Sequence, residues 1–598
     1  MVMNDIALVV VSPAGLETAN GLRSVLPGAR IHGLTGRVEG DECFSDTMAH
    51  LRTLFAAGIP IVGICAAGIL IRAVAPLLSD KRAEPPVLAV AVDGSSVVPL
   101  LGGHHGANAL ARRISQALGV APSLTTAGEL TLGLALDDPP PGWRITNLAA
   151  AKSVAAALLA EEEVALEIEA GDAQWLAGLS FAPEGEHAIR ITDRAVEPDD
   201  HELVFHPPVL TLGVGCERDT PPQELIALVR ETLAAEALSP LAIACVASID
   251  LKADEAAVHA LAAELGVPAR FFTAEELERE SDRLVHPSEV VFAETGCHGV
   301  SEGAALAAGD PRAELIVPKV KGARTTCAVA RSPHPVEPLT VGRARGRLFV
   351  VGIGPGTPEW RSPQASAAVA ASSDLVGYGM YLDLLGPAAA AKSRHESALG
   401  AEEARARKAL ELAAEGRTVS LVCSGDPGIY ALATLVFELL DREKRAEWNR
   451  VEVTVVPGIS ALQAAAARAG APVNHDFCTI SLSDLLTPWE ALEARLKAAA
   501  AADFVVCFYN PVSQRRRDQL IKARDILLTG RPAATPVILA RQLGRPGETV
   551  EVIALGDLTA DKVDMLTMVV VGSSETRHFT AGSQSWTYTP RGYGKKMG

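Results

Sequence analysis

Aromatic side chains, basic residues and long apolar runs are scarce in this sequence of 598 residues. Aromatic residues make up 4% of it, and the net charge of −18 argues against a general nucleic-acid binder, because phosphate binding needs a basic face. The longest apolar stretch, 59–71, is too short to span a bilayer. We therefore expect no nucleic-acid partner and no membrane segment.

The cysteines are not arranged for metal binding or for disulfides. All nine are scattered without a C-x-x-C pair, and no group of histidines has the spacing of a zinc site. Isolated thiols of this kind are typical of a reducing compartment. We predict a cytoplasmic protein with no metal centre.

The stretch VVGIGPGTP, 350–358, joins an apolar strand to a turn made almost wholly of Gly and Pro. Because glycine has no Cβ, the backbone amides of such a turn can approach a ligand closely, which is typical of a loop that holds a nucleotide-like cofactor. A dinucleotide-binding fold would need G-x-G-x-x-G and an acid at the end of the following strand. Here Pro355 interrupts the spacing and Asp374 precedes the next apolar run, so NAD and FAD are disfavoured.

Four more apolar runs that break at Gly, Pro, Asn or Ser follow this loop, at 421–432, 453–470, 504–511 and 536–548. Most read as buried strands that end in binding loops. Any one of them can be an ordinary strand-to-helix turn, but five in succession favour a single ligand site.

Residues 346–575 resemble the tetrapyrrole (precorrin) methyltransferase family, through GIGPG, SGDPGIY and VVPGIS. Within that family, the stretches at 378–385, 474–489 and 508–516 are similar to precorrin-3B C17-methyltransferase, the ring-contracting enzyme of cobalamin synthesis. The resemblance implies S-adenosylmethionine as the cofactor, precorrin-3B or cobalt-factor III as the substrate, and a homodimer. A methyltransferase acting on diphthine or ribosomal RNA is the weaker reading.

Carried over by motif, the residues implied to line the cofactor are Pro355, Gly356, Ser424, Gly425, Asp426, Ile429, Ser460, Ala461, Tyr509 and Arg541. Asp426 is also a catalytic candidate, because a carboxylate beside a sulfonium helps to hold the cation; the alternative is an Asx residue that stabilises the Asp-Pro-Gly turn. The arginines that can pair with acetate and propionate arms are Arg515, Arg516, Arg517, Arg541 and Arg545. The acid–base residue for ring contraction is not assigned.

Residues 1–136 alternate strand-like and helix-like segments, which predicts an α/β domain with a mainly parallel sheet and ligands at the carboxyl ends of its strands. One such end carries GGHHGAN, 102–108. His104 is our candidate general base and Asn108 its catalytic neighbour. The alternative is a helix N-terminus with a polar cap.

The stretch 63–129 is similar to the cobalt-precorrin-5A hydrolase family, which opens a ring-A lactone and releases acetaldehyde. The family's usual loop is Ser-Gly-His-x-Gly-Gly-Asn, whereas here it is Gly102 to Asn108 with the His and Asn retained; its Asp-Pro is Glu84-Pro85, and its later acid is displaced to Glu129. A non-catalytic tetrapyrrole-binding module is the alternative.

Residues 137–208 are expected to form a linker subdomain with a helix over 151–170 and short strands. A second α/β unit, 209–331, resembles the C-terminal domain of the same hydrolase family, and Lys319, Lys321 and Arg324 are its candidates for substrate carboxylates or for solvated edge charges. Cys297 and His298 are adjacent but have no third catalytic partner in the pattern.

The predicted fold class is therefore multidomain α/β: hydrolase-like domains, then a linker at 332–346, then a two-lobed tetrapyrrole methyltransferase fold at 347–598. Its lobes are expected at about 347–457 and about 458–598.

Overall fold

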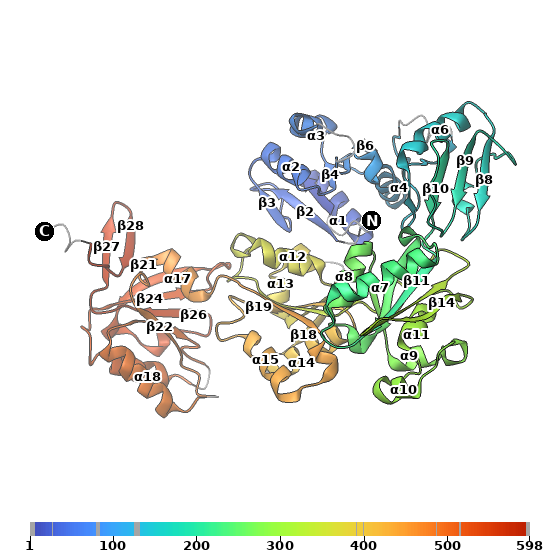
Figure 1. Cartoon of the computed structure of the whole chain (residues 1–598). Helices are drawn as coiled ribbons and strands as arrows, with labels where there is room; N and C mark the ends of the chain where they lie inside the picture. The colour runs from blue at the N-terminus through green and yellow to red at the C-terminus, as the bar shows by residue number, and fades with distance from the viewer. Residues whose placement is uncertain are drawn as a thin grey trace. The chain divides into compact units, whose positions relative to one another are not determined.

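The computed structural model describes residues 6–26, 28–78, 84–124, 132–389, 392–398, 400–485, 487–513 and 516–593. Two compact units divide the chain: Met1–Leu348 with Leu410–Thr418 and Lys444–Glu452, and Phe349–Ala409 with Val419–Glu443 and Val453–Gly598. Both are built from sheets and helices, which confirms the predicted fold class (Figure 1). Across the described residues, no helix is both long and apolar enough to cross a membrane.

The first sheet of the first unit has the order β3-β2-β1-β4-β5-β6 and is parallel except for β6. The short apolar strands β1, β4 and β5 are buried along their whole length, as parallel strands between helices must be. The strands are β1 (Ile6–Val10), β2 (Ala29–Leu34), β3 (Glu42–Phe44), β4 (Ile61–Ile64), β5 (Val87–Val90) and β6 (Val97–Leu101). The helices are α1 (Leu16–Val25), α2 (Thr47–Ala56), α3 (Ala67–Val74) and α4 (Ala107–Leu118).

The direction of β6 corrects one expectation. Leu101, the last residue of β6, pairs with Val87, the first residue of β5. The GGHHGAN loop therefore lies at the edge where β5 begins, opposite the carboxyl ends of β1, β4 and β5. The sequence misled us because an antiparallel last strand has the same apolar pattern as a parallel one.

The second sheet has the order β7-β10-β9-β8. Its elements are β7 (Arg144–Ile145), α6 (Ala151–Leu159), β8 (Val164–Ile168), β9 (His187–Ile191) and β10 (Glu202–His206). The helix predicted over 151–170 is therefore wrong in its second half: it ends at Leu159, Glu161 turns the chain with φ +58°, and a strand follows. Pairing of β8 with β9 outweighs the helix propensity of its Ala, Leu and Glu residues.

The third sheet has the order β13-β12-β11-β15-β14, with α7 and α8 on one face and α11 on the other (Figure 1). Gly213 allows α11 to lie close against β11, since a Cβ there would be 1.9 Å from the Ser301 carbonyl oxygen. The strands are β11 (Leu210–Cys216), β12 (Ile243–Ile249), β13 (Ala269–Phe272), β14 (Glu314–Lys321) and β15 (Thr325–Arg331). The helices are α7 (Pro222–Ala235), α8 (Ala256–Leu265), α9 (Ala274–Glu278), α10 (Glu289–Thr295) and α11 (Val300–Ala307).

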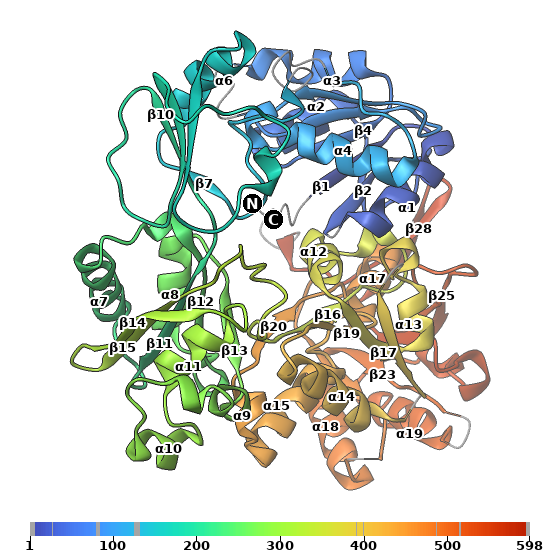
Figure 2. The ribbon, with the colours of Figure 1, turned by 90° about the vertical axis from the view of Figure 1, so that its right-hand side faces the viewer.

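The fourth sheet has the order β18-β17-β19-β16-β20. Its strands are β16 (Arg347–Gly352), β17 (Asp374–Tyr378), β18 (Ser393–Ser397), β19 (Thr418–Cys423) and β20 (Glu452–Val456). Figure 2 shows four accompanying helices from a second side: α12 (Pro363–Ala371), α13 (Gly379–Asp383), α14 (Glu402–Ala414) and α15 (Leu432–Glu443). A short helix, α16 (Ala446–Asn449), precedes β20.

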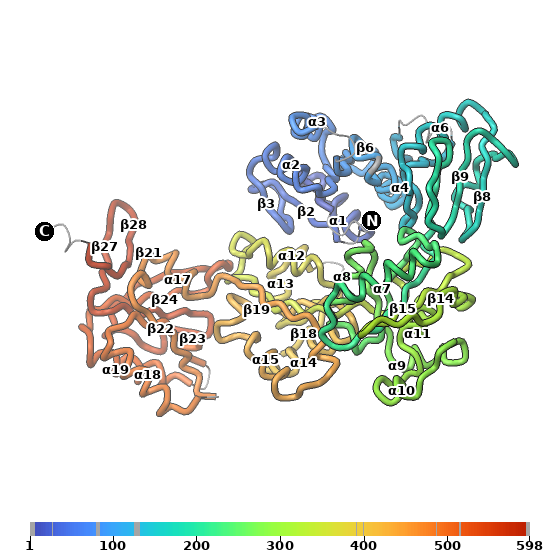
Figure 3. The backbone as a smooth tube through the Cα atoms, in the orientation of Figure 1, coloured from blue at the N-terminus to red at the C-terminus, as the bar shows by residue number. Residues whose placement is uncertain are grey.

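The last part of the chain forms a five-stranded sheet, β22-β23-β26-β24-β25, and a small one, β21-β28-β27 (Figure 3). The strands are β21 (Gly470–Ala471), β22 (Phe477–Ser481), β23 (Val505–Tyr509), β24 (Pro536–Arg541), β25 (Thr549–Ala554), β26 (Thr567–Val571), β27 (Arg577–Ala581) and β28 (Gln584–Tyr588). The helices are α17 (Ala461–Ala469), α18 (Trp489–Ala501) and α19 (Asp518–Leu527).

Candidate active site

Two strand-end loops in the second unit are joined by backbone hydrogen bonds. Gly354, after β16, donates to the Gly425 carbonyl at 3.2 Å, and the Gly425 amide donates back to Gly354 at 2.8 Å. The Gly-Pro-Gly loop and the Ser-Gly-Asp-Pro loop therefore form one continuous surface. Pro355, Ser424 and Gly425, all predicted cofactor residues, lie on it.

The glycines of these loops permit close contact with neighbouring backbone. A Cβ on Gly352 would lie 2.6 Å from the Gly425 carbonyl oxygen, and one on Gly356 would lie 1.9 Å from that of Gly544. Real Cβ atoms do not approach so closely, so larger residues would force the loops apart. The spacing G-x-G-x-G is thus required to assemble the loops themselves.

Asp426 fixes a further loop to this pair. Its Oδ1 accepts a hydrogen bond from the Gly428 amide at 2.8 Å, which is the Asx turn that the sequence left open as the alternative. Its Oδ2 accepts from the Gly458 amide at 3.1 Å, in the loop after β20. Asp426 therefore links two strand ends. Ile429 closes the same turn by donating to the Asp426 carbonyl at 3.4 Å.

The N-terminus of α17 borders the loop of β19. A Cβ on Gly425 would lie 3.7 Å from Ser460 Cα and 4.0 Å from the Ala461 nitrogen. The Tyr509 hydroxyl, at the end of β23, accepts from the Leu462 amide at 3.4 Å, and burial raises the pKa of Tyr509. The Leu462 amide is therefore already occupied, and the start of α17 favours a negatively charged or polar ligand group through the helix dipole.

Arg545 was proposed from the sequence only as a substrate contact, yet it joins the two bridged loops. Its Nε donates to the Pro355 carbonyl at 2.9 Å and its guanidinium donates to Ser424 Oγ at 3.1 Å. Burial lowers the pKa of Arg545. Arg541, the predicted cofactor residue, pairs instead with Asp564 at 2.6 Å in an exposed position.

Of the other arginines proposed for substrate carboxylates, Arg516 donates to the Leu482 and Asn510 carbonyls. Arg517 donates to the Ala560 carbonyl and pairs with Asp561 at 2.9 Å. Arg515 lies outside the described residues. The described pair therefore contacts protein rather than the bridged loops.

Three residues other than glycine near the ends of β19, β23 and β24 adopt a left-handed backbone. They are Tyr430 with φ +49°, Asn510 with φ +48° and Gln542 with φ +51°. Such conformations are uncommon outside glycine and gather at functional sites. The rings of Tyr430 and Tyr509 lie 5.1 Å apart, so the strained turn at Tyr430 borders the end of β23.

In the first unit, His104 belongs to a short turn, Gly103–His105, that precedes α4. The His104 side chain and Glu129 lie outside what the structure describes. Asn108 is the second residue of α4, and a Cβ on Gly103 would lie 4.0 Å from its Nδ2. Gly102 abuts the chain before β5, since a Cβ there would be 2.5 Å from the Pro86 nitrogen.

Cys297 and His298 do not form a catalytic pair in the structure. The Cys297 thiol is buried, and burial raises its pKa. His298 Nδ1 lies 2.7 Å from Glu278 and its ring stacks on Phe292. A protonated, buried thiol is a poor nucleophile.

Comparison with known proteins finds a family match for the part of the chain that carries these loops. Residues 347–559 match the model of Tetrapyrrole (Corrin/Porphyrin) Methylases. The Precorrin-3B C(17)-methyltransferase of Sinorhizobium sp is 45% identical over 249 residues, which are 42% of this chain and 97% of that protein. The chain belongs to the tetrapyrrole methylase family.

Two other stretches of the chain match further family models. Residues 49–129 match Cobalamin synthesis G N-terminal, and residues 210–330 match Cobalamin synthesis G C-terminus. The predicted fusion of hydrolase-like domains with a tetrapyrrole methylase is thereby confirmed.

Two further relatives match the methylase part. The Probable cobalt-factor III C(17)-methyltransferase of Salmonella typhimurium is 43% identical over 246 residues, 41% of this chain and 99% of that protein. The Cobalamin biosynthesis protein CobIJ of Mycobacterium bovis is 44% identical over 252 residues, 42% of this chain and 48% of that protein. The chain thus spans about half the length of its CobIJ relative.

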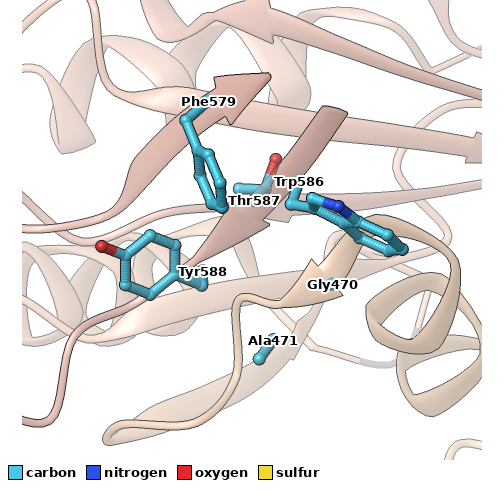
Figure 4. A pocket seen from close by; sticks show the side chains of 6 residues that line it. All are labelled: Gly470, Ala471, Phe579, Trp586, Thr587 and Tyr588. Carbon is cyan, nitrogen blue, oxygen red and sulfur yellow. The ribbon is translucent and has the colours of Figure 1, made fainter. Parts of the chain in front are cut away.

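The methylase part also carries a shallow apolar cavity of about 390 Å³ beside the β27–β28 hairpin (Figure 4). Its lining residues are Gly470, Ala471, Phe579, Trp586, Thr587 and Tyr588. None of them belongs to the predicted cofactor set. Phe579 is 45% exposed and Trp586 36% exposed, so this is an apolar surface patch.

Proposed function

We propose that residues 347–598 methylate C17 of precorrin-3B or cobalt-factor III and contract the macrocycle, with S-adenosylmethionine as the methyl donor. The observation that carries the proposal is the joined pair of loops after β16 and β19, which Arg545 and Asp426 connect to the loops after β24 and β20. The proposed substrate class is that of the relatives, which are C(17)-methyltransferases of precorrin-3B and of cobalt-factor III.

The residues that we propose to line the cofactor are Pro355, Gly356, Ser424, Gly425, Asp426, Ile429, Ser460, Ala461 and Tyr509. The loop after β19 borders the start of α17. The cofactor is proposed to bind at this junction, because strand ends and helix starts present backbone groups to ligands. Arg541 stays a weaker candidate, since its guanidinium is held by Asp564.

S-adenosylmethionine carries its own leaving group, so the protein chiefly binds, orients and excludes water. The macrocycle supplies the nucleophilic carbon, and no strong base is needed for methyl transfer. Asp426 and Arg545 act by holding the loops. If the cofactor binds with its sulfonium beside this loop, the Asp426 carboxylate would also stabilise that positive charge.

For the first unit we propose opening of a tetrapyrrole lactone of the cobalt-precorrin-5A type, with His104 and Asn108 as the candidate catalytic residues. Lactone opening by His104→Ala against wild type tests this. Loss of opening in the variant supports a hydrolase, whereas equal rates, or none in wild type, favour a binding module.

We further propose a cytoplasmic homodimer that associates through the methylase part. All nine cysteines are free thiols, as a reducing compartment requires. The exposed Phe579 and Trp586 form an apolar patch beside β28 that a second copy can cover. Sedimentation of wild type and Trp586→Ser tests this, with a shift of the variant toward monomer expected.

The decisive experiment is anaerobic turnover with S-adenosylmethionine and either metal-free precorrin-3B or cobalt-factor III. Product mass and absorbance are followed, with Asp426→Ala as the comparison variant. Gain of one methyl group on one substrate identifies it. Loss of two hydrogen bonds to a charged acceptor, about 1.5–3 kcal/mol each, should slow Asp426→Ala by at least about tenfold. Methylation of neither tetrapyrrole would refute the assignment.

A further inference from the structure

The domain at 210–331 contains a cavity of about 700 Å³. It opens where β11 and β12 end, at Cys216 and Ile249, and is closed by the start of α11 and the β14–β15 hairpin. Carboxyl ends of parallel strands are where open α/β sheets bind ligands. The volume is in the range of about 300–1,000 Å³ that is usual for small-molecule sites.

Two hydroxyl groups in the wall of this cavity have no hydrogen-bond partner among the described residues. Ser301 is 1% exposed and Thr325 is 3% exposed, and both line the cavity. A buried hydroxyl that is left unpaired destabilises the fold, and a ligand that bonds to it removes that cost. Ser301 is also the second residue of α11, where backbone amides have no partner within the helix. The wall therefore offers unused donors to a ligand.

The charges around the cavity favour an anion. Lys321 has no ion-pair partner in the described part of the chain. Lys319 donates to the His286 carbonyl at 2.9 Å, and burial lowers its pKa. The acids that line the cavity, Glu217 and Glu294, are exposed, whereas the two hydroxyls are buried.

Three other basic residues at the cavity are already paired with carboxylates. One of them, Lys252, lies 3.6 Å from Glu255. Arg218 pairs with Asp254 at 2.7 Å, and Arg324 pairs with Glu224 at 2.8 Å. The groups in the cavity wall that a ligand can still bind are therefore the Lys321 ammonium and the Ser301 and Thr325 hydroxyls.

A buried carboxylate holds this wall in place. Glu302, 1% exposed, accepts hydrogen bonds from the backbone amides of Val285, His286 and Lys319, at 2.9, 3.0 and 2.8 Å. The start of α11 is thus fixed to β14 and to the loop before α10. A preorganised wall reduces the entropy lost when a ligand binds.

We infer that this cavity is a tetrapyrrole-binding site, separate from the methylase loops, in which Lys321, Ser301 and Thr325 bind a carboxylate arm of the macrocycle. The identity of the ligand rests on the proposed function; the carboxylate chemistry rests on the cavity itself. Cys216 also lines it, but burial raises the pKa of that thiol, so the site binds without a covalent step.

The test uses the full chain and uroporphyrin, an octacarboxylate tetrapyrrole, whose fluorescence reports the number of sites and their Kd values. The variants are Lys321→Met and Thr325→Val, singly and together; valine keeps the shape of threonine and removes only the hydroxyl. Lys152→Met, an exposed lysine on α6, is the matched control. Inorganic phosphate and glutarate are titrated as competitors to separate a tetrapyrrole site from a general anion site.

We expect one uroporphyrin site to weaken about tenfold in each single variant and further in the double variant, because each loses one hydrogen bond to a charged group. Lys152→Met should stay within about twofold of wild type. Unchanged Kd values in the double variant would overturn the inference. The inference would also be overturned if inorganic phosphate displaced bound uroporphyrin as effectively as free uroporphyrin does.

Methyl transfer is measured on the same variants and should be unchanged, since these residues belong to the first unit. If neither tetrapyrrole is methylated but the double variant still loses a uroporphyrin site, the proposed methyltransferase function fails and this inference stands. If methylation proceeds and the variants bind normally, only the inference fails.

Discussion

Replacing Arg545 by lysine tests whether the methylase loops are assembled as the structure shows. Arg545 donates to the Pro355 carbonyl and to Ser424 Oγ from two different nitrogens. A lysine keeps the charge but has a single nitrogen on a flexible stem, so it cannot reproduce a planar fork that reaches two loops. At least one of the two contacts is lost.

The expected size of the effect follows from those contacts. A hydrogen bond that involves a charged group contributes about 1.5–3 kcal/mol, and about 1.4 kcal/mol is tenfold in affinity. If the loops hold the cofactor, Arg545→Lys should bind S-adenosylhomocysteine about 10- to 100-fold more weakly than wild type. Arg545→Met, which loses both contacts, should be weaker still.

Isothermal titration with S-adenosylhomocysteine measures this directly. Arg442→Lys is the matched control, because Arg442 is an exposed arginine on α15 that pairs with Glu403. Arg541→Lys is the discriminating variant, since the sequence pattern assigns the cofactor to Arg541 and the contacts favour Arg545. If Arg541→Lys lost affinity and Arg545→Lys did not, the reasoning from the loop contacts would be refuted.

Three further outcomes follow from single residues. Gly356→Ala should lower S-adenosylhomocysteine affinity about tenfold, because its Cβ would lie 1.9 Å from the Gly544 carbonyl oxygen; titration against Gly178→Ala, which has open space, checks this. Burial beside His50 and Arg30 lowers the pKa of His32 to about 3, below the 6.5 of the unfolded chain, so the folded state binds fewer protons and loses stability as pH falls from 6.5 toward 3. At about pH 5 this loss is about 2 kcal/mol, and thermal unfolding of His32→Gln should depend less on pH than that of wild type. Cys43 is the one exposed thiol of the nine, so iodoacetamide should modify it first, and mass spectrometry that finds Cys297 modified earlier would contradict its burial.

The strand ends of the methylase part were predictable because their signals are local. A β-branched run that breaks at Gly, Pro or Asn identifies a strand end, and the described ends of β16, β19, β20 and β23 lie where the sequence predicts them. The contacts between those ends were not predictable. Whether Arg541 or Arg545 reaches the loop of Pro355 depends on the turn at Gln542 and Gly544, both with positive φ, and on no periodic pattern.

The sequence failed where strand direction or pairing decides the structure. Residues 151–170 have the composition of one helix, yet Val164–Ile168 pairs with β9. The apolar run of β6 has no feature that separates an antiparallel strand from a parallel one, so the position of the His104 loop could not be known.

The direction of β6 bears on the function of the first unit. The loop of His104 and the carboxyl ends of β4 and β5 lie at opposite edges of one sheet, so they cannot surround one small ligand. A hydrolytic site at His104 must therefore draw its other groups from the amino-terminal edge, where Pro85 and Pro86 lie against Gly102. The Asp-Pro of the family pattern, which is Glu84-Pro85 here, lies at this same edge, because a Cβ on Gly102 would be 2.6 Å from the Pro85 carbonyl oxygen. Glu84→Gln should accordingly slow lactone opening, as His104→Ala should, whereas substitutions at the end of β4 should leave its rate unchanged.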